Sequence, residues 1–314
     1  MEQTQSAVII NSPKILNQVR KAVVGKDDVL LWVLATILAK GHVLLEDIPG
    51  VGKTTMALAF SRALGLSYNR MQFNPDVLPS DVTGYSILEQ HTGQMIYKPG
   101  AVLCNLFLAD ELNRATSRTQ SALLEAMEEG QVTVDGTSHR LPVPFTVIAT
   151  QNPAGAAGTQ LLPDSQIDRF MIRLSLGYPA PKDEVSMLLD RQHGDPLKQV
   201  EPVVDTAGLA AMQQQVANTQ VVPEIAEYVV KLIDATRRSD TLLRGGSPRA
   251  TLATIALAKA VAQLQGRDYV VPKDVQEVFV HTLSHRVLPA PGQDAPAQEL
   301  LKSLMDKIRA PRLR

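Results

Sequence analysis

Short apolar segments alternate with helical patterns between about residue 40 and residue 178. Five of these segments, each bounded by turn or polar residues, predict strands at 43–45, 70–73, 106–109, 146–149 and 171–174. Strands that alternate with helices usually pair in parallel and have both faces covered. The pattern therefore predicts an α/β fold built on a parallel sheet.

One stretch departs from this alternation. Residues 131–134 and 140–141 have strand character and flank the dipeptide Asp135-Gly136. Asp-Gly favours the primed turn whose twist matches that of two antiparallel strands. We therefore expect a β-hairpin at 131–141, inserted before the strand at 146–149.

Helical periodicity dominates after the segment Pro179-Ala180-Pro181. Six helices are predicted, at 183–191, 206–217, 224–237, 248–264, 273–283 and 298–308. The change of pattern predicts two units, an α/β core at 1–180 and a helical domain at 181–314.

The longest apolar run, residues 29–39, predicts a core helix near the N-terminus. Asp27 and Asp28 precede it, and Lys40-Gly41 predicts its C-terminal cap. Its eleven residues fall short of the roughly 20 that span a bilayer, and the first residues lack the basic character of a signal peptide. The chain has one cysteine, Cys104, which fits a reducing compartment. We expect a cytoplasmic protein without a membrane anchor.

The charge balance and the aromatic content of the chain limit the kinds of ligand that it can bind. Among 314 residues, 31 Lys and Arg oppose 32 Asp and Glu, for a net charge of −1, and aromatic residues make up 4%. A nearly neutral chain with few aromatic side chains lacks the basic surface and stacking platforms of nucleic-acid binders. Any anionic ligand must therefore be held by a local site.

A glycine-rich segment predicts such a site. Residues 46–55 follow a predicted strand and open a helix that ends before Gly65, which is the context of a phosphate-binding P-loop. Backbone N–H groups at Gly50 and Gly52 can converge on phosphate oxygens, Lys53 can reach the β and γ phosphates, and Thr54 can ligate Mg²⁺. The predicted nucleotide contacts of this segment are Asp47, Ile48, Pro49, Gly50, Val51, Gly52, Lys53, Thr54 and Thr55.

Asp47 stands where the strict P-loop pattern has its first glycine. Aspartate tolerates left-handed backbone angles better than most residues, so we expect the turn to form with Asp47 in that conformation. The alternative is a glycine-rich turn between strand and helix that binds no ligand.

The strand at 106–109 leads into two carboxylates, Asp110 and Glu111. In a parallel sheet the carboxyl ends of the strands form the edge where ligands bind, which is also the edge of the P-loop. Asp110 would hold Mg²⁺ through water, and Glu111 would polarise the attacking water. The alternative is a solvated strand end.

Three further polar residues are candidates for catalysis. Asn152 can hold the attacking water from an adjacent strand, or belong to an ordinary Asn-Pro turn. Arg169 can act as an arginine finger, or pair with an acid of its own chain. Arg249 follows Ser247, a good N-cap, and Pro248, a good first helical residue, so it lies in a first turn where the helix dipole disfavours a cation. Such a placement indicates an anionic partner.

These segments, taken in order, resemble the motifs of MoxR-type AAA+ ATPases over nearly the whole chain. The matching stretches are residues 24–26, 44–55, 72–76, 78–81, 109–115, 119–136, 149–153, 166–170 and 247–250. The resemblance implies an AAA+ core with sheet order 5-1-4-3-2, a helical lid that carries sensor 2, and a ring of protomers, usually six, with ATP bound between them.

The resemblance also implies roles for individual residues. It assigns Walker A to Lys53 and Thr54, Walker B to Asp110 and Glu111, sensor 1 to Asn152, the finger on a neighbour's ATP to Arg169, and sensor 2 to Arg249. It places Val24 and Gly25 at the nucleotide, beside Lys26, where AAA+ proteins commonly have glutamine. Arg114 matches the family's segment after Walker B, either as an interprotomer contact or as a simple salt bridge.

Two insertions resemble those of the AAA+ branch that includes magnesium-chelatase subunits and MCM helicases. Residues 72–100 resemble the helix-2 insert, and 131–141 the hairpin before sensor 1. In those relatives such insertions face the pore or the client.

The expected function is ATP hydrolysis with Mg²⁺ that moves the lid relative to the core, with Arg249 reporting the γ phosphate from the lid. In the family this remodels client proteins, as chaperone-like maturation or metal-cofactor insertion, often with von Willebrand factor A domain proteins. The alternatives are a DNA-dependent motor, a chelatase-like subunit and a non-enzymatic nucleotide-binding scaffold.

Overall fold

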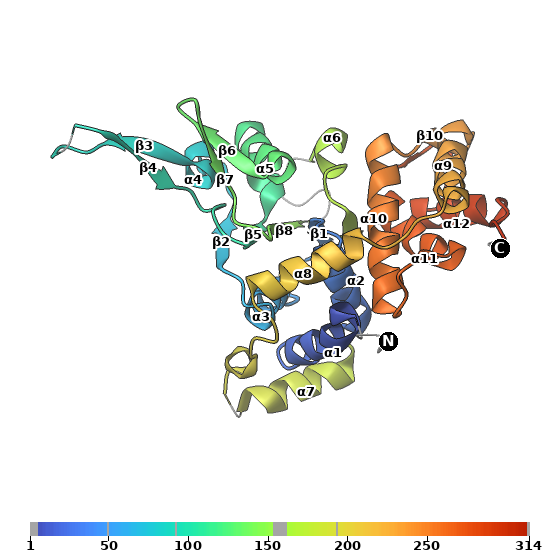
Figure 1. Ribbon diagram of the computed structural model, residues 1–314, viewed down its shortest axis with the longest axis horizontal. Coiled ribbons are helices and arrows are strands. Elements are labelled where there is room, and N and C mark those ends of the chain that lie inside the picture. The colour runs from blue at the N-terminus through green and yellow to red at the C-terminus, as the bar shows by residue number, and fades with distance from the viewer. Residues whose placement is uncertain (1–5, 49, 92, 153–161, 193, 313–314) are drawn as a thin grey trace, which may run out of the picture.

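The computed structural model describes residues 6–48, 50–91, 93–152, 162–192 and 194–312. Pro49, one of the expected nucleotide contacts, lies outside the described residues. An α/β unit and a bundle of helices lie side by side, and two β-hairpins extend from the α/β unit (Figure 1). No helix in the described ranges is both long and apolar enough to cross a bilayer.

A five-stranded parallel sheet forms the centre of the α/β unit. Its strands are β1 (Val43–Glu46), β2 (Tyr68–Gln72), β5 (Leu106–Asp110), β8 (Thr146–Gln151) and β9 (Ile172–Leu174). They pair in the order β2-β5-β8-β1-β9, and every pair is parallel. If these strands are numbered 1 to 5 along the chain and the sheet is read from β9 to β2, the order is 5-1-4-3-2. The expected order is therefore confirmed.

The two faces of this sheet pack into two separate cores. Because successive side chains of a strand point to opposite faces, Leu106 and Leu108 enter one core while Phe107 and Ala109 enter the other. The first core also contains residues of α1 (Ala7–Arg20), α2 (Asp27–Leu38) and α3 (Lys53–Ala63), and the second contains residues of α5 (Ser117–Glu129). Burial on both faces explains why the strands are continuous apolar runs.

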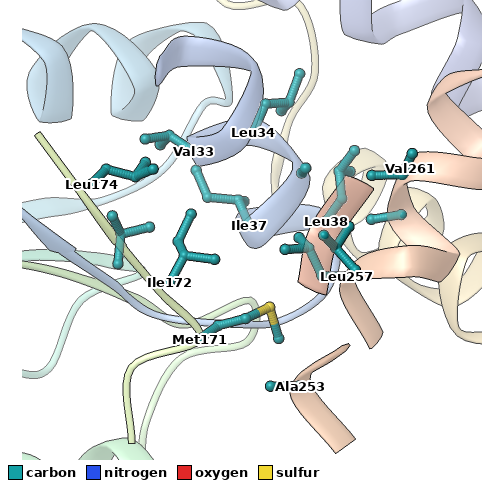
Figure 2. Packing of buried hydrophobic residues seen from close by; sticks show 14 of the residues in the cluster. Val33, Leu34, Ile37, Leu38, Met171, Ile172, Leu174, Ala253, Leu257 and Val261 are labelled. Atoms are coloured by element: carbon teal, nitrogen blue, oxygen red, sulfur yellow. The ribbon is translucent and has the colours of Figure 1, made fainter. Parts of the chain in front are cut away.

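The first core continues into the helical unit. Side chains of α2, β9 and α10 (Pro248–Leu264) pack together, as Figure 2 shows. The residues in view include Ile37, Ile172 and Leu257, all buried. The sheet and the lid helix α10 therefore share one hydrophobic core across α2.

All six helices predicted after residue 180 are present. They are α7 (Pro181–Gln192), α8 (Thr206–Ala217), α9 (Pro223–Arg238), α10, α11 (Pro272–Leu283) and α12 (Ala297–Asp306). Helix α8 packs against α1, α2 and α10. Helices α9 to α12 pack on one another, and α10 also contacts α1 and α2. A small antiparallel pair, β10 (Leu242–Arg244) with β11 (Leu288–Pro289), was not predicted in this part of the chain. The division near residue 180 stays a prediction.

The two hairpins extend on the side of α5. The predicted one is confirmed as β6 (Gln131–Val134) and β7 (Thr137–Arg140), with Asp135 at φ 49° and Gly136 at φ 77° as the primed turn requires. The second, β3 (Gly84–Leu88) with β4 (Met95–Pro99), follows α4 (Pro79–Thr83) inside the 72–100 insert. The ring of Tyr97 stacks on that of His139 with 3.6 Å between centroids, which joins the two hairpins.

Helix α2 ends differently from the expectation. Lys40, not Gly41, adopts the left-handed conformation after the helix, with φ 58°. Position 41 requires glycine for a steric reason: a Cβ there would lie 2.7 Å from Sδ of Met171, which is too close. The glycine thus permits a close approach between the α2–β1 connection and the start of β9.

Candidate active site

The P-loop connects β1 to α3 at the carboxyl-terminal edge of the sheet. Gly50 and Gly52 have φ of 89° and 96°, and a Cβ at either position would meet no atom within 4 Å. Their backbone angles therefore call for glycine, and the space beside them is open. This geometry suits backbone N–H groups that point at a phosphate from the start of α3.

Lys53, the first residue of α3, is buried beneath this loop. Its Nζ donates to the carbonyl oxygens of Asp47 at 2.8 Å and Ile48 at 3.3 Å. Burial lowers the pKa of Lys53, and the nearby negative charges of Asp47, Asp110 and Glu111 partly offset that effect. The ammonium group is therefore held within the loop and close to the carboxylates of Asp110 and Glu111.

Asp47 does not adopt the left-handed conformation that we expected. Among the described residues other than glycine, only Lys40, Glu111 and Asp135 have positive φ. Instead, the buried Asp47 carboxylate accepts hydrogen bonds from the Ser175 hydroxyl at 2.7 Å and from the N–H groups of Leu176 at 2.6 Å and Gly177 at 3.0 Å, after β9. It anchors the segment that follows the last strand of the sheet against the P-loop.

A cavity of about 480 Å³ lies beside the loop. Val24, Val51 and Thr55, all predicted contacts, line it together with apolar residues that include Met187 of α7. Gly25 lies against Asp183 of α7, and the half-buried Thr54 follows Lys53 in the first turn of α3. A largely apolar cavity next to a phosphate loop suits a nucleotide base.

Asp110 ends β5 with both carboxylate oxygens engaged. Oδ1 accepts from the Thr150 hydroxyl at 2.7 Å, and Oδ2 accepts from a terminal nitrogen of Arg70 at 2.7 Å. Arg70 was not singled out from the sequence. Arg70 and Gln72 alternate along β2 and so point to the same face of the sheet. Because β2 lies next to β5, that pattern could have indicated polar partners for Asp110 and Glu111.

Glu111 is held in a strained and densely bonded position. Its φ of 56° is left-handed, and its N–H donates to the Thr150 hydroxyl at 2.8 Å. Its carboxylate accepts from Arg114 at 2.9 Å, Gln72 at 3.3 Å and Asn152 at 3.4 Å. Burial acts to raise the pKa of Glu111, but these hydrogen bonds outweigh it and hold the pKa below the usual value. The carboxylate is therefore ionised at neutral pH, and Arg114 forms an intrachain salt bridge.

Asn152 lies beside Glu111 with a free acceptor. Its main-chain N–H and C=O both bond to the side chain of Asn113, at 3.3 and 3.2 Å, which fixes the end of β8. Its Oδ1 is buried without a hydrogen-bond partner among the described residues. Buried acceptors are rarely left unpaired, so this oxygen is suited to a ligand or a water molecule.

Arg169 and Arg249 lie at the opposite edge of the sheet. Arg169 precedes β9, whose Ile172 pairs with Val43 at the amino end of β1, whereas the P-loop follows the carboxyl end of β1. Arg169 pairs with Glu128 of α5 at 3.3 Å, and Arg249 forms an ion pair with the same carboxylate. The structure thus brings Lys53, Asp110, Glu111 and Asn152 together but separates both arginines from them.

The arginine pair borders a small cavity of about 110 Å³, lined by His42, Met127, Glu128, Arg169 and Arg249. The Nε of Arg169 is buried without a partner among the described residues. Glu128 was not singled out from the sequence, because nothing local to it indicates that two distant arginines converge there. The ion pair with an acid of its own chain, one of the two alternatives for Arg169, is thus present, and the role at a neighbouring protomer stays a prediction.

Family models match both parts of the chain. A model described as "ATPase family associated with various cellular activities (AAA)" matches residues 42–172, and one described as "AAA lid domain" matches residues 234–304. The first spans the P-loop, the acidic pair, Asn152 and Arg169, and the second begins within α9 and includes Arg249.

Several relatives align over most of their length. The protein YeaC of Bacillus subtilis is 42% identical over 95% of this chain and 94% of its own. "Chaperone MoxR1" of Mycobacterium tuberculosis is 39% identical over 86% and 74%, and "Protein MoxR" of Methylorubrum extorquens is 30% identical over 94% and 93%.

A solved crystal structure has the same fold as this chain. The crystal structure of a candidate ATPase from Cytophaga hutchinsonii superposes with a TM-score of 0.89 at 32% identity, over 97% of this chain and 96% of that one. The sheet order, the P-loop and the full-length relatives all lead to the same assignment. This chain, with its nucleotide-binding AAA+ core and helical lid, belongs to the MoxR family of AAA+ ATPases.

Proposed function

We propose that this protein hydrolyses ATP to ADP and phosphate at sites completed between neighbouring protomers of a ring, and that it uses this cycle to remodel client proteins. The observation that carries the proposal is the separation of the site into two halves. The P-loop and Walker B residues lie at one edge of the sheet, and the arginine pair lies at the other. Head-to-tail contacts that join one edge to the opposite edge of the next copy generate rings, and six protomers are the number that we propose.

In this proposal, the first half binds the nucleotide. The N–H groups around Gly50 and Gly52 cradle the phosphates, Lys53 reaches the β and γ phosphates, and the cavity at Val24 and Val51 receives the base.

The residues also fit Mg²⁺, which prefers oxygen ligands and retains several waters. Thr54 offers a hydroxyl and Asp110 a carboxylate. The Asp110 carboxylate lies close enough to Lys53 to act to raise its pKa. When bound, the ion would neutralise charge on the phosphate oxygens.

Glu111 serves as the base for the attacking water. Its lowered pKa keeps it ionised, and its longest hydrogen bonds, from Gln72 and Asn152, are the ones that a water molecule can most readily replace. The unpaired Oδ1 of Asn152 offers a second acceptor for the same water. These assignments are consistent with sensor 1 at Asn152.

The arginine pair serves the neighbour. Because Arg169 and Arg249 share Glu128, we propose that both act on one nucleotide, that of the adjacent protomer. This revises the expectation that Arg249 reads the nucleotide of its own chain. Arg249 lies in the first turn of α10, where the helix dipole disfavours a cation, and an incoming phosphate would offset that cost as Glu128 does here.

Client proteins would bind at the hairpins. Exposed apolar side chains on the β3–β4 hairpin, at Tyr85, Leu88 and Met95, offer a surface for a client protein, and the Tyr97–His139 stack couples it to β6–β7. One relative is named a chaperone. We propose client maturation, including metal-cofactor insertion, together with a von Willebrand factor A domain protein, in the cytoplasm, where the buried Cys104 would stay reduced.

Mixed rings test the interprotomer site. Arg169→Ala should bind ATP but hydrolyse it about 10³-fold more slowly, the usual effect of losing an arginine finger. Glu111→Gln should also bind ATP without turnover. A mixture of the two should regain activity, because some sites then combine an intact Glu111 with an intact Arg169 from the next protomer.

The readout is phosphate release at fixed total protein, across mixing ratios. Arg238→Ala, which removes an exposed arginine of α9 that pairs with Asp234, is the matched control and should keep the original rate. Absence of any recovery in the mixture, with both variants folded, would show that Arg169 does not act in trans.

A further inference from the structure

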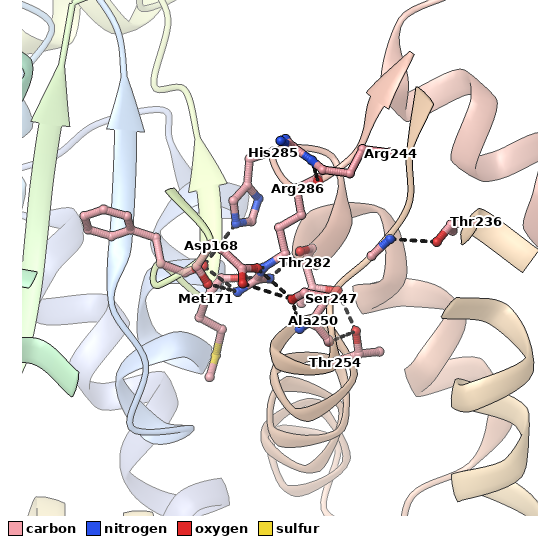
Figure 3. A network of polar contacts seen from close by, with 12 residues as sticks. Asp168, Met171, Thr236, Arg244, Ser247, Ala250, Thr254, Thr282, His285 and Arg286 are labelled. Atoms are coloured by element: carbon pink, nitrogen blue, oxygen red, sulfur yellow. Dashed lines mark hydrogen bonds and ion pairs between the residues drawn. The ribbon is translucent and has the colours of Figure 1, made fainter. Parts of the chain in front are cut away.

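One carboxylate connects the two segments that carry the arginine pair. Asp168, next to Arg169, accepts from the Ser247 hydroxyl at 3.0 Å to each of its oxygens. Ser247 also accepts from the N–H of Ala250 at 3.1 Å as the N-cap of α10 (Figure 3). The first turn of that helix carries Arg249. Asp168 therefore links the entry to β9, in the core, to the start of α10, in the lid.

Arg286, just after α11, completes this connection. Its side chain is only 2% exposed, and its Nε donates to Asp168 Oδ1 at 2.8 Å. Its terminal nitrogens donate to the carbonyls of Asp168 at 3.0 Å, Phe170 at 2.7 Å and Met171 at 3.2 Å, and also to that of Thr282. A guanidinium has five N–H donors in a planar fork, and here each has an acceptor.

The lid therefore holds segment 168–171 through three of its four carbonyl groups, those of Asp168, Phe170 and Met171. His285 adds a further contact, since its Nε2 donates to the Phe170 carbonyl at 3.0 Å. A buried charge with every donor satisfied is expensive to disturb, because removing one partner leaves the other unpaired in a low-dielectric environment. Residues 168–171, which include Arg169, are therefore fixed to α10 and α11 more firmly than surface ion pairs could fix them.

We propose that Arg286, Asp168 and Ser247 are positioning residues that hold Arg169 and Arg249 as one rigid unit directed at the nucleotide of the neighbouring protomer. This inference rests on the proposed interprotomer site and extends it to residues that touch no nucleotide. It also revises the expected motion of the lid relative to the core: when loss of a phosphate releases the arginines, residues 168–171 of the core move together with α10 and α11, relative to the neighbouring protomer.

Arg286→Lys tests the proposal. Lysine keeps the charge but has three donors on one nitrogen, so it cannot reproduce the planar fork. We expect kcat to fall about 10-fold to 100-fold, as when catalytic groups are displaced by about 1 Å, while KM for ATP and calorimetric ATP binding stay close to those of the original protein.

The matched control is Arg267→Lys. Arg267 makes a comparable forked contact with Asp274, at 2.6 and 2.8 Å, but lies wholly within the lid. Its kcat should stay within about twofold of the original if only the core–lid link matters.

A second variant covers the case in which Arg286→Lys does not fold. Ser247→Asp keeps a good N-cap acceptor for the N–H of Ala250 but loses the donor to Asp168 and repels its carboxylate. It should show the same loss of kcat with unchanged KM, and circular dichroism and thermal melting verify that it is folded.

Mixing each variant with Glu111→Gln separates positioning from general damage. If Arg286→Lys and Ser247→Asp act through the arginine pair, the mixture should recover activity as Arg169→Ala does. If Arg169→Ala recovers but the folded variants keep full kcat alone, or lose kcat without recovery, the positioning role is overturned and the interprotomer site stands. If Arg169→Ala itself does not recover, both proposals are overturned.

Discussion

Single side chains in this protein often do something other than what their place in a motif suggests. Asp47 occupies a glycine position of the P-loop pattern, yet its backbone is not left-handed, and its carboxylate holds Ser175, Leu176 and Gly177 instead. The residue joins the nucleotide loop to the chain that leaves β9 toward α7. Its contribution is therefore to stability and loop placement.

We predict that Asp47→Gly, which restores the glycine of the strict pattern, lowers the free energy of unfolding by about 2–5 kcal/mol and does not strengthen ATP binding. The buried N–H of Leu176 and the half-buried N–H of Gly177 would lose their acceptor, at about 1–3 kcal/mol each. Urea unfolding and calorimetric titration with ATP measure the two quantities. Asp135→Gly, at an exposed left-handed position, should change stability by less than about 0.5 kcal/mol, because aspartate, unlike lysine, tolerates that conformation well. Tighter ATP binding by Asp47→Gly would contradict this role.

At the scale of elements, the junction between α2 and β1 shows how neighbouring positions divide two tasks. Lys40 takes the left-handed turn after the helix although glycine would do so at lower cost, while Gly41 is reserved for the close approach of Met171. Met171 follows Arg169 by two residues, so this contact supports the start of β9.

Two substitutions at this junction should have opposite signs. Lys40→Gly should raise the free energy of unfolding by about 1 kcal/mol, since the left-handed conformation costs a side chain roughly that much. Gly41→Ala should lower it by about 1–3 kcal/mol, because its Cβ would overlap the Met171 side chain. Urea denaturation of both variants is the measurement, and a stabilising Gly41→Ala would disprove the close-approach argument.

For the whole molecule, buried histidines connect stability to pH. His42 is buried between the sheet and α5, where its Nδ1 accepts from the Val147 N–H at 3.0 Å and its Nε2 donates to the Met127 carbonyl at 3.3 Å. Burial lowers the pKa of His42 to about 4, and burial likewise lowers that of His285 well below its usual value. Both rings are therefore neutral in the folded protein.

The sign of the pH effect follows. Below about pH 6.5 the unfolded chain binds protons at these histidines while the folded protein does not, so stability falls as pH decreases from about 7 to 4. His42 alone accounts for about 3 kcal/mol over that window. His42→Asn should be less stable at pH 7 but lose stability less steeply, whereas His91→Asn, at an exposed position, should follow the original slope. Urea unfolding at pH 7, 6 and 5 gives the slopes, and equal slopes for all three proteins would refute the assignment.

Local sequence was enough to predict the strands, the helices after residue 180, the Asp-Gly hairpin and the P-loop with its acidic pair. These features depend on periodicity, turn chemistry and residues within one loop, which short-range backbone preferences determine. The N-terminal helix α1 and the β3–β4 hairpin were missed, because their patterns are weaker and their stability comes from packing and pairing. The sheet order came from the resemblance and is confirmed.

Only the tertiary structure determined which charged side chains form ion pairs. Arg70 on Asp110, two distant arginines on Glu128, and Arg286 on Asp168 each join residues from different elements. No local pattern encodes such pairs, because their energy depends on burial and on donors converging from several elements after the core has packed. The sequence by itself therefore determined the nucleotide-binding loop and the class of fold. Only the folded chain placed Glu111 and the arginine pair at opposite edges of one sheet, which is the arrangement that the proposed active site shared between protomers requires.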